Sequence, residues 1–310
     1  MIMHRSDQAL AIRALRSAAP YIRMYKGKTF VVKAGGGVFA DGAATRVLVE
    51  QIAILHYFGV RVVLVHGGGP QLTELSAALG VPTRMVEGRR VTDEKSIDVT
   101  AMVLNGLINT RILGICRDLD IDAVGISGVD AGLVRAHKRA PMRTGSGELV
   151  DFGFVGDIDA VDTTVLKKLL ENGLMPVVSP LSADASGTLL NINADTVAAA
   201  IGAALGAEKL ILCTGAPGIL GDLADPGSLI SYTDLSGLQR LRDQGRIAEG
   251  MLPKARAIEE ALRGGVRRVH VVSYQSPEGI LGEVFTNEGT GTMIVADVHA
   301  LPPAEQQAGA

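Results

Sequence analysis

The sequence predicts an α/β fold in which a mainly parallel central sheet is covered by helices. Short apolar runs rich in β-branched residues alternate along the chain with segments whose apolar residues recur at helical spacing. Several runs are apolar on both faces, which is typical of parallel strands between two layers of helices. In open sheets of this kind, ligands bind beyond the carboxyl ends of the strands.

The expected elements follow from these runs in chain order. A strand begins at Thr29, and helices are expected from Arg46 to Phe58 and over QLTELSAALG. Between Leu133 and Ile158, loosely alternating residues around TGSGE predict a β-hairpin that leaves the main sheet. The clearest further strand runs are Arg61–Val65, Ala123–Ser127, Met175–Ser179, Lys209–Cys213 and Arg268–Ser273.

Two of the predicted strands end in glycine-rich loops. TFVVKAGGG places Lys33 at the mouth of the first loop, and RVVLVHGGGP forms the second. Glycine lets backbone N–H groups approach an anion closely, and a lysine adds a compact positive charge. Neither loop has the G-x-x-x-x-G-K-[ST] pattern, and either alone could be an ordinary turn. Both together, with Lys33, indicate a phosphate site.

Two later segments contain further candidates. In NINADTVAAAIGAALG, Asn193 or Asp195 can cap an alanine-rich helix. In EGMLPKARAIEEAL, Pro253 suits the first helical position and so places Lys254 in the first turn. There the helix dipole disfavours a cation by about 0.3–1 kcal/mol, unless an anionic group lies nearby. We therefore expect an anionic group near Lys254, with a solvated surface lysine as the simpler alternative.

Other polar groups leave alternatives open. EGRRVTDE carries two arginines, of which one could clamp a carboxylate with its planar fork, although the segment could also be a solvated charged turn. His66 could act as a base or could simply be bound by a backbone group. Metal ligands at recognisable spacing are not found, so Mg²⁺ is expected to arrive with nucleotide phosphates.

Composition limits the classes of function. The 310 residues are 47% hydrophobic and 20% charged, which is normal for a globular protein with a large core. A net charge of -3 argues against a nucleic-acid or anionic-membrane partner. Cys116 and Cys213 belong to no C-x-x-C pair and are expected to be buried free thiols. No signal-peptide pattern or uncharged apolar run of about 20 residues is found, so a cytoplasmic location is expected.

Seven motifs together resemble one family. VVKAGGG, HGGGPQ, GRRVTDE, DFGFVGD, NINADT, GMLPK and FTNEGTGTMI occur in this order between Pro20 and Val295. In sequence and order they resemble the acetylglutamate kinases of the amino-acid kinase superfamily. The resemblance implies an open αβα sandwich that phosphorylates the side-chain carboxylate of N-acetyl-L-glutamate with MgATP, giving N-acetyl-L-glutamyl 5-phosphate in arginine biosynthesis.

The resemblance also implies roles for individual residues. The catalytic residues would be Lys33, Lys254 and Asp195. Acetylglutamate would be bound by Gly68, Gly69, Arg90 and Asn191. ATP and its phosphates would be bound by Gly35, Gly36, Lys33, Thr214, Gly218 and Lys254. The sequence departs from the family pattern at Thr214 and Gly215, where relatives often carry Asp, and at Val129, which replaces a usual lysine. These departures concern the nucleotide contacts.

The resemblance further implies regulation by L-arginine. The N-terminal segment SDQALAIRALRSAAPYIRMYKG predicts a short helix with a modestly apolar face, which Pro20 would kink or end. It could lie on its own domain. PYIRMYKGKTF resembles the arginine-inhibited kinases, which are hexamers built from three dimers linked by such helices. In those relatives the residues surrounding arginine match Tyr21, His270, Glu288 and Gly289.

The expected organisation has four parts. Residues 1–27 would form a helical segment for oligomerisation and regulation, 28–182 a lobe for acetylglutamate and dimerisation, and 183–298 a nucleotide lobe, with a disordered tail at 299–310. Two other functions stay open. SYQ and PYIRMYKGKTF also resemble the kinase-like, arginine-binding domain of N-acetylglutamate synthases, which does not phosphorylate. The other alternative is a kinase for a longer substrate, such as an aminoadipate derivative.

Overall fold

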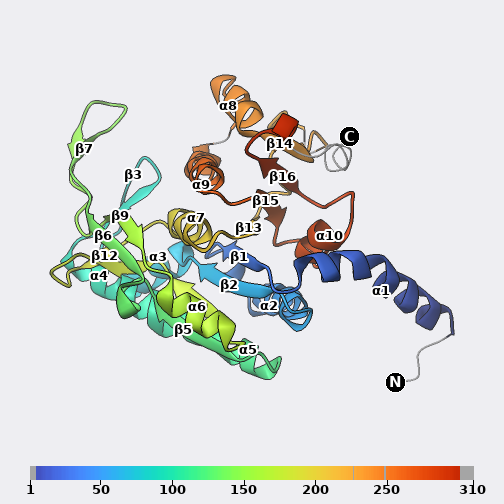
Figure 1. Ribbon diagram of the computed structural model, residues 1–310. Helices are drawn as coiled ribbons and strands as arrows, with labels where there is room; N and C mark the ends of the chain where they lie inside the picture. The colour runs from blue at the N-terminus through green and yellow to red at the C-terminus, as the bar shows by residue number, and fades with distance from the viewer. Residues whose placement is uncertain (1–4, 226, 248, 301–310) are drawn as a thin grey trace.

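The centre of the molecule is one eight-stranded sheet. The computed structural model describes residues 5–225, 227–247 and 249–300 (Figure 1). The strand order is β14-β16-β15-β13-β1-β2-β10-β5. Neighbouring strands are parallel except β15 and β16, which are antiparallel. The strands are β1 (Thr29–Ala34), β2 (Arg61–His66), β5 (Ala123–Ser127), β10 (Met175–Ser179), β13 (Lys209–Thr214), β14 (Tyr232–Asp234), β15 (Arg268–Ser273) and β16 (Thr292–Val295). The predicted fold class and strand runs are therefore confirmed.

Two hydrophobic cores lie on opposite faces of this sheet. Val31 of β1 belongs to one core, whereas Phe30 and Val32 belong to the other. Successive side chains of a strand point to opposite faces, so a strand covered on both sides must be apolar throughout. The first core packs against α6 (Thr164–Glu171), α7 (Ala194–Leu205), α8 (Leu235–Asp243) and α9 (Leu252–Arg263). The second packs against α2 (Gly42–Tyr57), α3 (Gly69–Ala78), α4 (Glu94–Ala101), α5 (Thr110–Asp118) and α10 (Gly279–Phe285).

Smaller sheets surround the carboxyl end of the main sheet. β6 (Val134–Lys138) pairs antiparallel with β9 (Gly156–Val161), which confirms the predicted hairpin excursion. Figure 1 shows this excursion rising away from the main sheet beside the β3–β4 hairpin. The other short strands are β3 (Arg84–Val86), β4 (Arg89–Val91), β7 (Met142–Arg143), β8 (Leu149–Val150), β11 (Leu181–Ala183) and β12 (Leu189–Asn191). The two arginines of EGRRVTDE therefore lie on a strand.

The N-terminal helix is longer than the sequence predicts. α1 (Arg5–Tyr25) continues through Pro20, so the expectation that it could end there is wrong. Proline removes one N–H from the helix and displaces the carbonyl four residues earlier, that of Arg16. Arg16 is exposed, so water can bind this carbonyl. Figure 1 shows α1 reaching out from the sheet with its C-terminal end beside α10.

A continuous helical segment, Glu94–Asp118, is long and apolar enough by composition to cross a bilayer. It comprises α4, a π-helix labelled η2 (Met102–Asn109), and α5. Buried residues of each part pack in the second core, among them Val103, Ile108 and Cys116. Core helices of globular proteins commonly have this composition. Cys116 and Cys213 are both buried and free, as predicted.

The proposed division into lobes stays a prediction. Strands β1 and β2 from the first part and β13 and β15 from the second are neighbours in the same sheet. The chain passes from β10 to β11 at the predicted boundary near Ser182. Of the predicted tail, residues 301–310 lie outside the described residues.

Candidate functional site

The two glycine loops meet, as predicted, at the carboxyl ends of β1 and β2. These strands are parallel neighbours, and Ala34 is paired with His66. A Cβ on Gly36 would lie 2.7 Å from Cδ of Pro70 and 2.8 Å from the backbone nitrogen of Gly69. Only glycine allows this approach. Gly69 also opens α3, where the first N–H groups have no partner within the helix and can bind an anion.

Gln71 joins the two loops. Its Nε2 donates a 2.8 Å hydrogen bond to the carbonyl of Gly36. Its Oε1 is buried and accepts no hydrogen bond from the residues that the structure describes, so an acceptor faces the junction of the loops. The sequence contains Gln71 within HGGGPQ, but nothing in the pattern indicated which atom it would contact.

Three charged side chains converge beside the loops. Asp195 forms an ion pair with Lys33, with Oδ1 2.7 Å from Nζ, and its Oδ2 accepts a hydrogen bond from Nζ of Lys254 at 3.4 Å. Lys33 and Asp195 are buried, whereas the Lys254 side chain is 21% exposed. The simpler interpretation of Lys254 as a solvated surface lysine is therefore wrong. Two ammonium groups share one carboxylate, which leaves about one positive charge for an anionic ligand.

The helix starts explain this convergence. Asn193 caps α7, because its Oδ1 accepts from the backbone N–H groups of Asp195 and Thr196 at 2.8 and 3.2 Å. The Asp195 carboxylate is thus left for the lysines. Burial alone would raise the pKa of Asp195, but the charges of Lys33 and Lys254 lower it. Lys254 stands in the first turn of α9, where this carboxylate offsets the unfavourable helix dipole.

The predicted substrate residues lie on the neighbouring short strands. Arg90 donates from Nη2 to Oγ1 of Thr73 at 2.7 Å and to the carbonyl of Gly69 at 3.3 Å. It therefore reaches from β4 to the second glycine loop. Asn191 donates from Nδ2 to Oγ1 of Thr92 at 3.3 Å. No sequence pattern indicated that Thr92, which is fully buried, joins these two strands.

Backbone hydrogen bonds hold Thr92 against the DFGFVGD segment. Thr92 donates to the carbonyl of Phe152, and Phe154 donates back to the carbonyl of Thr92. Between them Gly153 has φ +73°, and a Cβ there would lie only 2.2 Å from the carbonyl oxygen of Thr92. Glycine is required at this position for both reasons. The motif DFGFVGD therefore joins the hairpin excursion to the substrate region.

The predicted nucleotide residues follow β13. Thr214 ends this strand, and its Oγ1 donates to the carbonyl of Ala216 at 2.9 Å. Gly218 is enclosed, because a Cβ there would lie 2.6 Å from both Cδ1 of Leu229 and Oγ1 of Thr292. The Tyr274 hydroxyl lies between the first glycine loop and the segment after β13, where it would touch a Cβ on Gly37 at 2.9 Å.

His66 is buried on all sides. Its side chain is 0% exposed, and burial lowers the pKa of His66 to about 4. Phe39 packs edge-on against the ring. The imidazole is therefore neutral at physiological pH and has no open path to a substrate. Of the two sequence-based alternatives, the structure favours a histidine held by its surroundings.

The residues predicted to surround arginine lie around α10 and the loop that follows it. The Tyr21 hydroxyl donates to Oδ1 of Asn287. His270 is buried and contacts Oε1 of Glu283 through Nδ1 at 2.7 Å. Gly289 is also close to Glu283, since a Cβ there would lie 2.8 Å from Oε2. Glu288 is exposed. Glu283, which no sequence motif indicated, is the carboxylate beside His270 and Gly289.

Glu283 belongs to a buried polar cluster. Burial alone would raise the pKa of Glu283, but its hydrogen bond with His270 and two backbone N–H groups lower it to about 2. Those N–H groups belong to Thr290 and Gly291. Nζ of Lys209 lies 2.8 Å from Nε2 of His270. Burial first, and then the charge of Lys209, lower the pKa of His270 to about 4.

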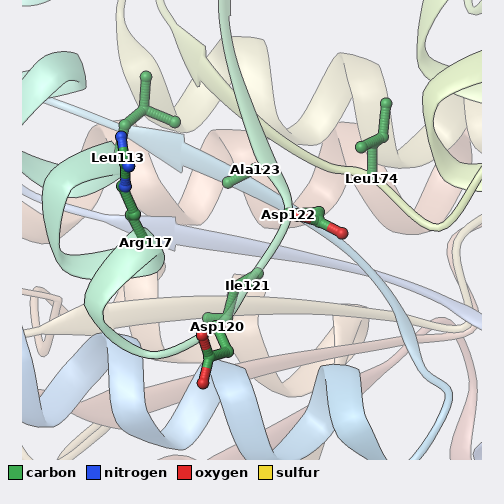
Figure 2. Close-up of a pocket in the computed structure, with 7 residues that line it drawn as sticks. All are labelled: Leu113, Arg117, Asp120, Ile121, Asp122, Ala123 and Leu174. Atoms are coloured by element: carbon green, nitrogen blue, oxygen red, sulfur yellow. The ribbon is translucent and has the colours of Figure 1, made fainter.

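A pocket of about 670 Å³ lies elsewhere on the molecule, at the amino ends of β5 and β10 (Figure 2). It contains none of the predicted site residues, because the glycine loops lie at the opposite, carboxyl ends of the strands. Its lining residues are Leu113, Arg117, Asp120, Ile121, Asp122, Ala123 and Leu174. In the part of the chain that the structure describes, no three His, Cys, Asp or Glu side chains are grouped closely enough to hold a metal ion.

Comparison with known proteins agrees with this site. The amino acid kinase family matches residues 28–273. The chain is 48% identical over 296 residues to the acetylglutamate kinase of Myxococcus xanthus and 43% identical over 281 residues to that of Symbiobacterium thermophilum. These matches cover 94% and 91% of this chain, and 96% of each relative.

A solved structure of N-acetylglutamate synthase from Neisseria gonorrhoeae, complexed with coenzyme A and L-arginine, is also similar. It superposes with a TM-score of 0.79 at 28% identity, covering 92% of this chain. The chain spans only 65% of that synthase, whereas it spans nearly the whole length of the kinases. The chain therefore belongs to the amino acid kinase family and, within it, to the acetylglutamate kinases.

Proposed function

We propose that the protein transfers the γ-phosphoryl group of ATP to the side-chain carboxylate of N-acetyl-L-glutamate, as a step of arginine biosynthesis. The observation that carries the proposal is the contact of Lys33 and Lys254 with one carboxylate, Asp195, where two glycine loops meet. Phosphoryl transfer spreads negative charge over the transferred group, and catalysis depends mainly on positioning and charge. This site supplies both.

The bond changes need no proton transfer. A carboxylate oxygen of the substrate attacks the γ-phosphorus, and the bond from that phosphorus to the bridging oxygen of ADP breaks with its electron pair. The nucleophile is already an anion, so the neutral, buried His66 is not required as a base. Lys33 and Lys254 stabilise the charge that develops, and Asp195 holds the two ammonium groups apart from each other and in place.

Arg90 and Asn191 would bind the substrate's α-carboxylate. Arg90 is half-buried and already directed at the second glycine loop, and burial lowers its pKa without removing its charge. Gly68 and Gly69 would donate backbone N–H groups at the start of α3, and Gly35 and Gly36 would do so on the ATP side, with Thr214 and Gly218 nearer the nucleotide. Mg²⁺ would enter with the ATP phosphates, since the carboxylate of Asp195 beside the loops is engaged by two lysines.

The test is to incubate the purified protein with MgATP and N-acetyl-L-glutamate and to trap acyl phosphate with hydroxylamine. We expect hydroxamate that depends on MgATP and on the substrate. N-acetyl-L-aminoadipate, one methylene longer, serves as the matched comparison and should give a lower kcat/KM. No hydroxamate with either substrate would reject the kinase and favour the arginine-binding alternative, and a preference for the longer substrate would reject acetylglutamate.

We further propose that L-arginine inhibits the enzyme and that α1 links dimers into a hexamer. Support comes from the exposed apolar side chains of α1 and from the cluster beside its C-terminal end. Leu10, Ile12 and Leu15 are 69%, 55% and 59% exposed. Glu288, which is exposed, offers a carboxylate for a cationic amino acid near Tyr21, His270 and Gly289, whereas both oxygens of the buried Glu283 are already engaged. A cytoplasmic location is part of the same proposal, supported by the two free cysteines.

Deleting Met1 to Arg23 tests the regulatory proposal. The truncated protein should be dimeric by light scattering and weakly inhibited or insensitive, whereas the full chain should be hexameric and inhibited by millimolar arginine. Glu283→Gln and Glu288→Gln then separate two carboxylates of one region, and the larger loss of inhibition is expected for Glu288→Gln, because Glu288 is exposed whereas Glu283 is already engaged. A full-length protein that is dimeric and not inhibited by millimolar arginine would contradict the proposal.

A further inference from the structure

The π-helix η2 lies directly behind the second glycine loop. It extends over eight residues, Met102–Asn109. π-Helices are rare, and where they interrupt an α-helix it is frequently at a functional site. Here the helix packs against the loop, since a Cβ on Gly68 would lie 2.6 Å from Cδ1 of Ile108 and 2.8 Å from Cδ2 of Leu104. The last residue of η2, Asn109, turns its side chain towards the sheet.

Asn109 makes two directed hydrogen bonds in the core. Its Nδ2 donates to the carbonyl of Val177 at 3.0 Å and lies 3.3 Å from Nε2 of His66. A backbone carbonyl can only accept, so the Asn109 atom that faces Val177 must be the amide nitrogen. The second N–H of that nitrogen then points at His66. Its Oδ1 lies against Gly125, where an added Cβ would be only 2.0 Å from it.

These contacts determine where the proton of His66 lies. Nε2 accepts from Asn109, so in the neutral ring the proton is on Nδ1. Nδ1 faces the carbonyl of Gly67, the first glycine of the loop, at 3.5 Å. The same residue donates its own N–H to the carbonyl of Ala34 on β1 at 2.9 Å. The contact with Ala34 thus holds the peptide group before Gly67, and the contact with His66 holds the peptide group after it.

We propose that Asn109 is a positioning residue for phosphoryl transfer: it fixes the Nδ1–H tautomer of His66 and thereby aims the N–H groups of the second glycine loop at the transferred group. The catalytic part of this inference rests on the proposed function, whereas the tautomer does not. Asn109 does not reach the substrate. It acts through His66, whose ring is buried between Asn109 and Phe39, and through the apolar contact of η2 with Gly68.

The experiment begins with the full-length wild-type protein and nitrogen-15 NMR of the His66 imidazole at neutral pH. A neutral Nδ1–H tautomer is expected, and an Nε2–H tautomer would overturn the proposal without any variant being needed. Asn109→Asp has the same shape but presents only acceptors, so it should shift the proton to Nε2. If the aspartate variant does not fold, the His66 tautomer is measured in Asn109→Ala, whose side chain neither donates nor accepts a hydrogen bond.

Kinetics of the same variants give the second readout. Loss of Asn109 should lower kcat by up to about 100-fold while the KM for ATP changes little, because a displaced second loop weakens contacts made in the transition state and does not bind the nucleotide. Thr100→Val is the control, since it removes a buried hydroxyl that donates to Ser96 at 2.7 Å in the same helical segment. An equal loss of kcat in Thr100→Val, or an unchanged kcat in the Asn109 variants, would contradict the proposal. Failure of wild-type hydroxamate formation would instead reject the proposed function and leave the tautomer measurable.

Discussion

Asp195 is the residue on which the site depends most directly, because one buried carboxylate holds two lysines that come from different elements. Lys33 is the second-last residue of β1 and Lys254 lies in the first turn of α9, so neither element alone could bring the two lysines together. Asp195→Asn removes the charge and leaves Lys33 buried without its ion pair. We expect a loss of about 3 kcal/mol in the free energy of unfolding, measured with denaturant, because breaking a buried pair leaves an uncompensated charge. An unchanged midpoint would contradict this arrangement.

The two lysines should act on kcat. If Lys33 and Lys254 stabilise charge that develops in the transition state, Lys33→Ala and Lys254→Ala should each lower kcat by about 10²–10³-fold. Lys168→Ala, on the exposed face of α6, is the matched control and should have no effect. An effect confined to KM would show that the lysines only bind substrate.

Arg90 should govern acetylglutamate and not ATP. Arg90→Lys keeps the charge but loses the planar fork, so the KM for acetylglutamate should rise about tenfold, which corresponds to about 1.4 kcal/mol. Its neighbour provides the control, because Arg89 contacts Met142 and not the glycine loop. A rise in the KM for ATP alone, or an equal effect of Arg89→Lys, would refute the assignment.

At this scale the sequence was informative about residue types but not about partners. The glycine loops, Lys33 and Lys254 could be singled out because their types and positions suit phosphate chemistry. Gln71, Thr92 and Asn109 could not, since each acts through a contact with a residue distant in sequence. Glu283 was missed for the same reason: its importance comes from burial beside His270, which no local pattern reveals.

Among the elements, buried strands were the easiest to predict. A strand covered on both faces is a continuous apolar run, and all five runs predicted from Arg61 onwards are strands. The β3–β4 hairpin, η2 and the full length of α1 were harder. The hairpin is charged and partly exposed, and a π-helix has the same composition as an α-helix. Pro20 suggested that α1 could end there, but the helix continues because the displaced carbonyl of the exposed Arg16 can bind water.

The hairpin excursion should transmit its position to the substrate site through Gly153. Gly153→Ala would place a Cβ 2.2 Å from the Thr92 carbonyl, so it should raise the KM for acetylglutamate and lower the Tm. Gly147→Ala is a close control, since Gly147 also has positive φ, at +86°, but a Cβ there meets nothing within 4 Å. It should cost only about 1–2 kcal/mol of backbone strain, with KM unchanged. Equal effects of the two substitutions would mean that the excursion does not position the site.

For the whole molecule, two buried histidines should make the free energy of unfolding depend on pH. Burial lowers the pKa of His66 to about 4 from 6.5, and it lowers the pKa of His270 in the same direction. The unfolded chain therefore binds more protons between these values, so the free energy of unfolding should fall as pH falls from 6.5 to 4. For His66 alone the loss is about 3 kcal/mol.

Denaturant unfolding across that pH range measures this dependence. His66→Gln should flatten the slope, and His137→Gln should not, because His137 lies on the surface beside Asp159. If the His66 variant is too unstable to compare, the wild-type slope itself decides. A free energy of unfolding that is constant or rises as pH falls would contradict the buried, neutral state of both rings.

The shared sheet also has a mechanical consequence. Residues from Phe30 to Ala34 are paired in register with residues from Lys209 to Cys213, and this ladder joins the two halves of the chain at the middle of the sheet. A hinge at this seam would rupture a row of backbone hydrogen bonds and would wet both cores at once. The sheet is therefore expected to be rigid at the junction of β1 and β13. Any closure over substrates must therefore come from segments outside the eight-stranded sheet. These are the β3–β4 hairpin, the hairpin excursion and the segment after β13.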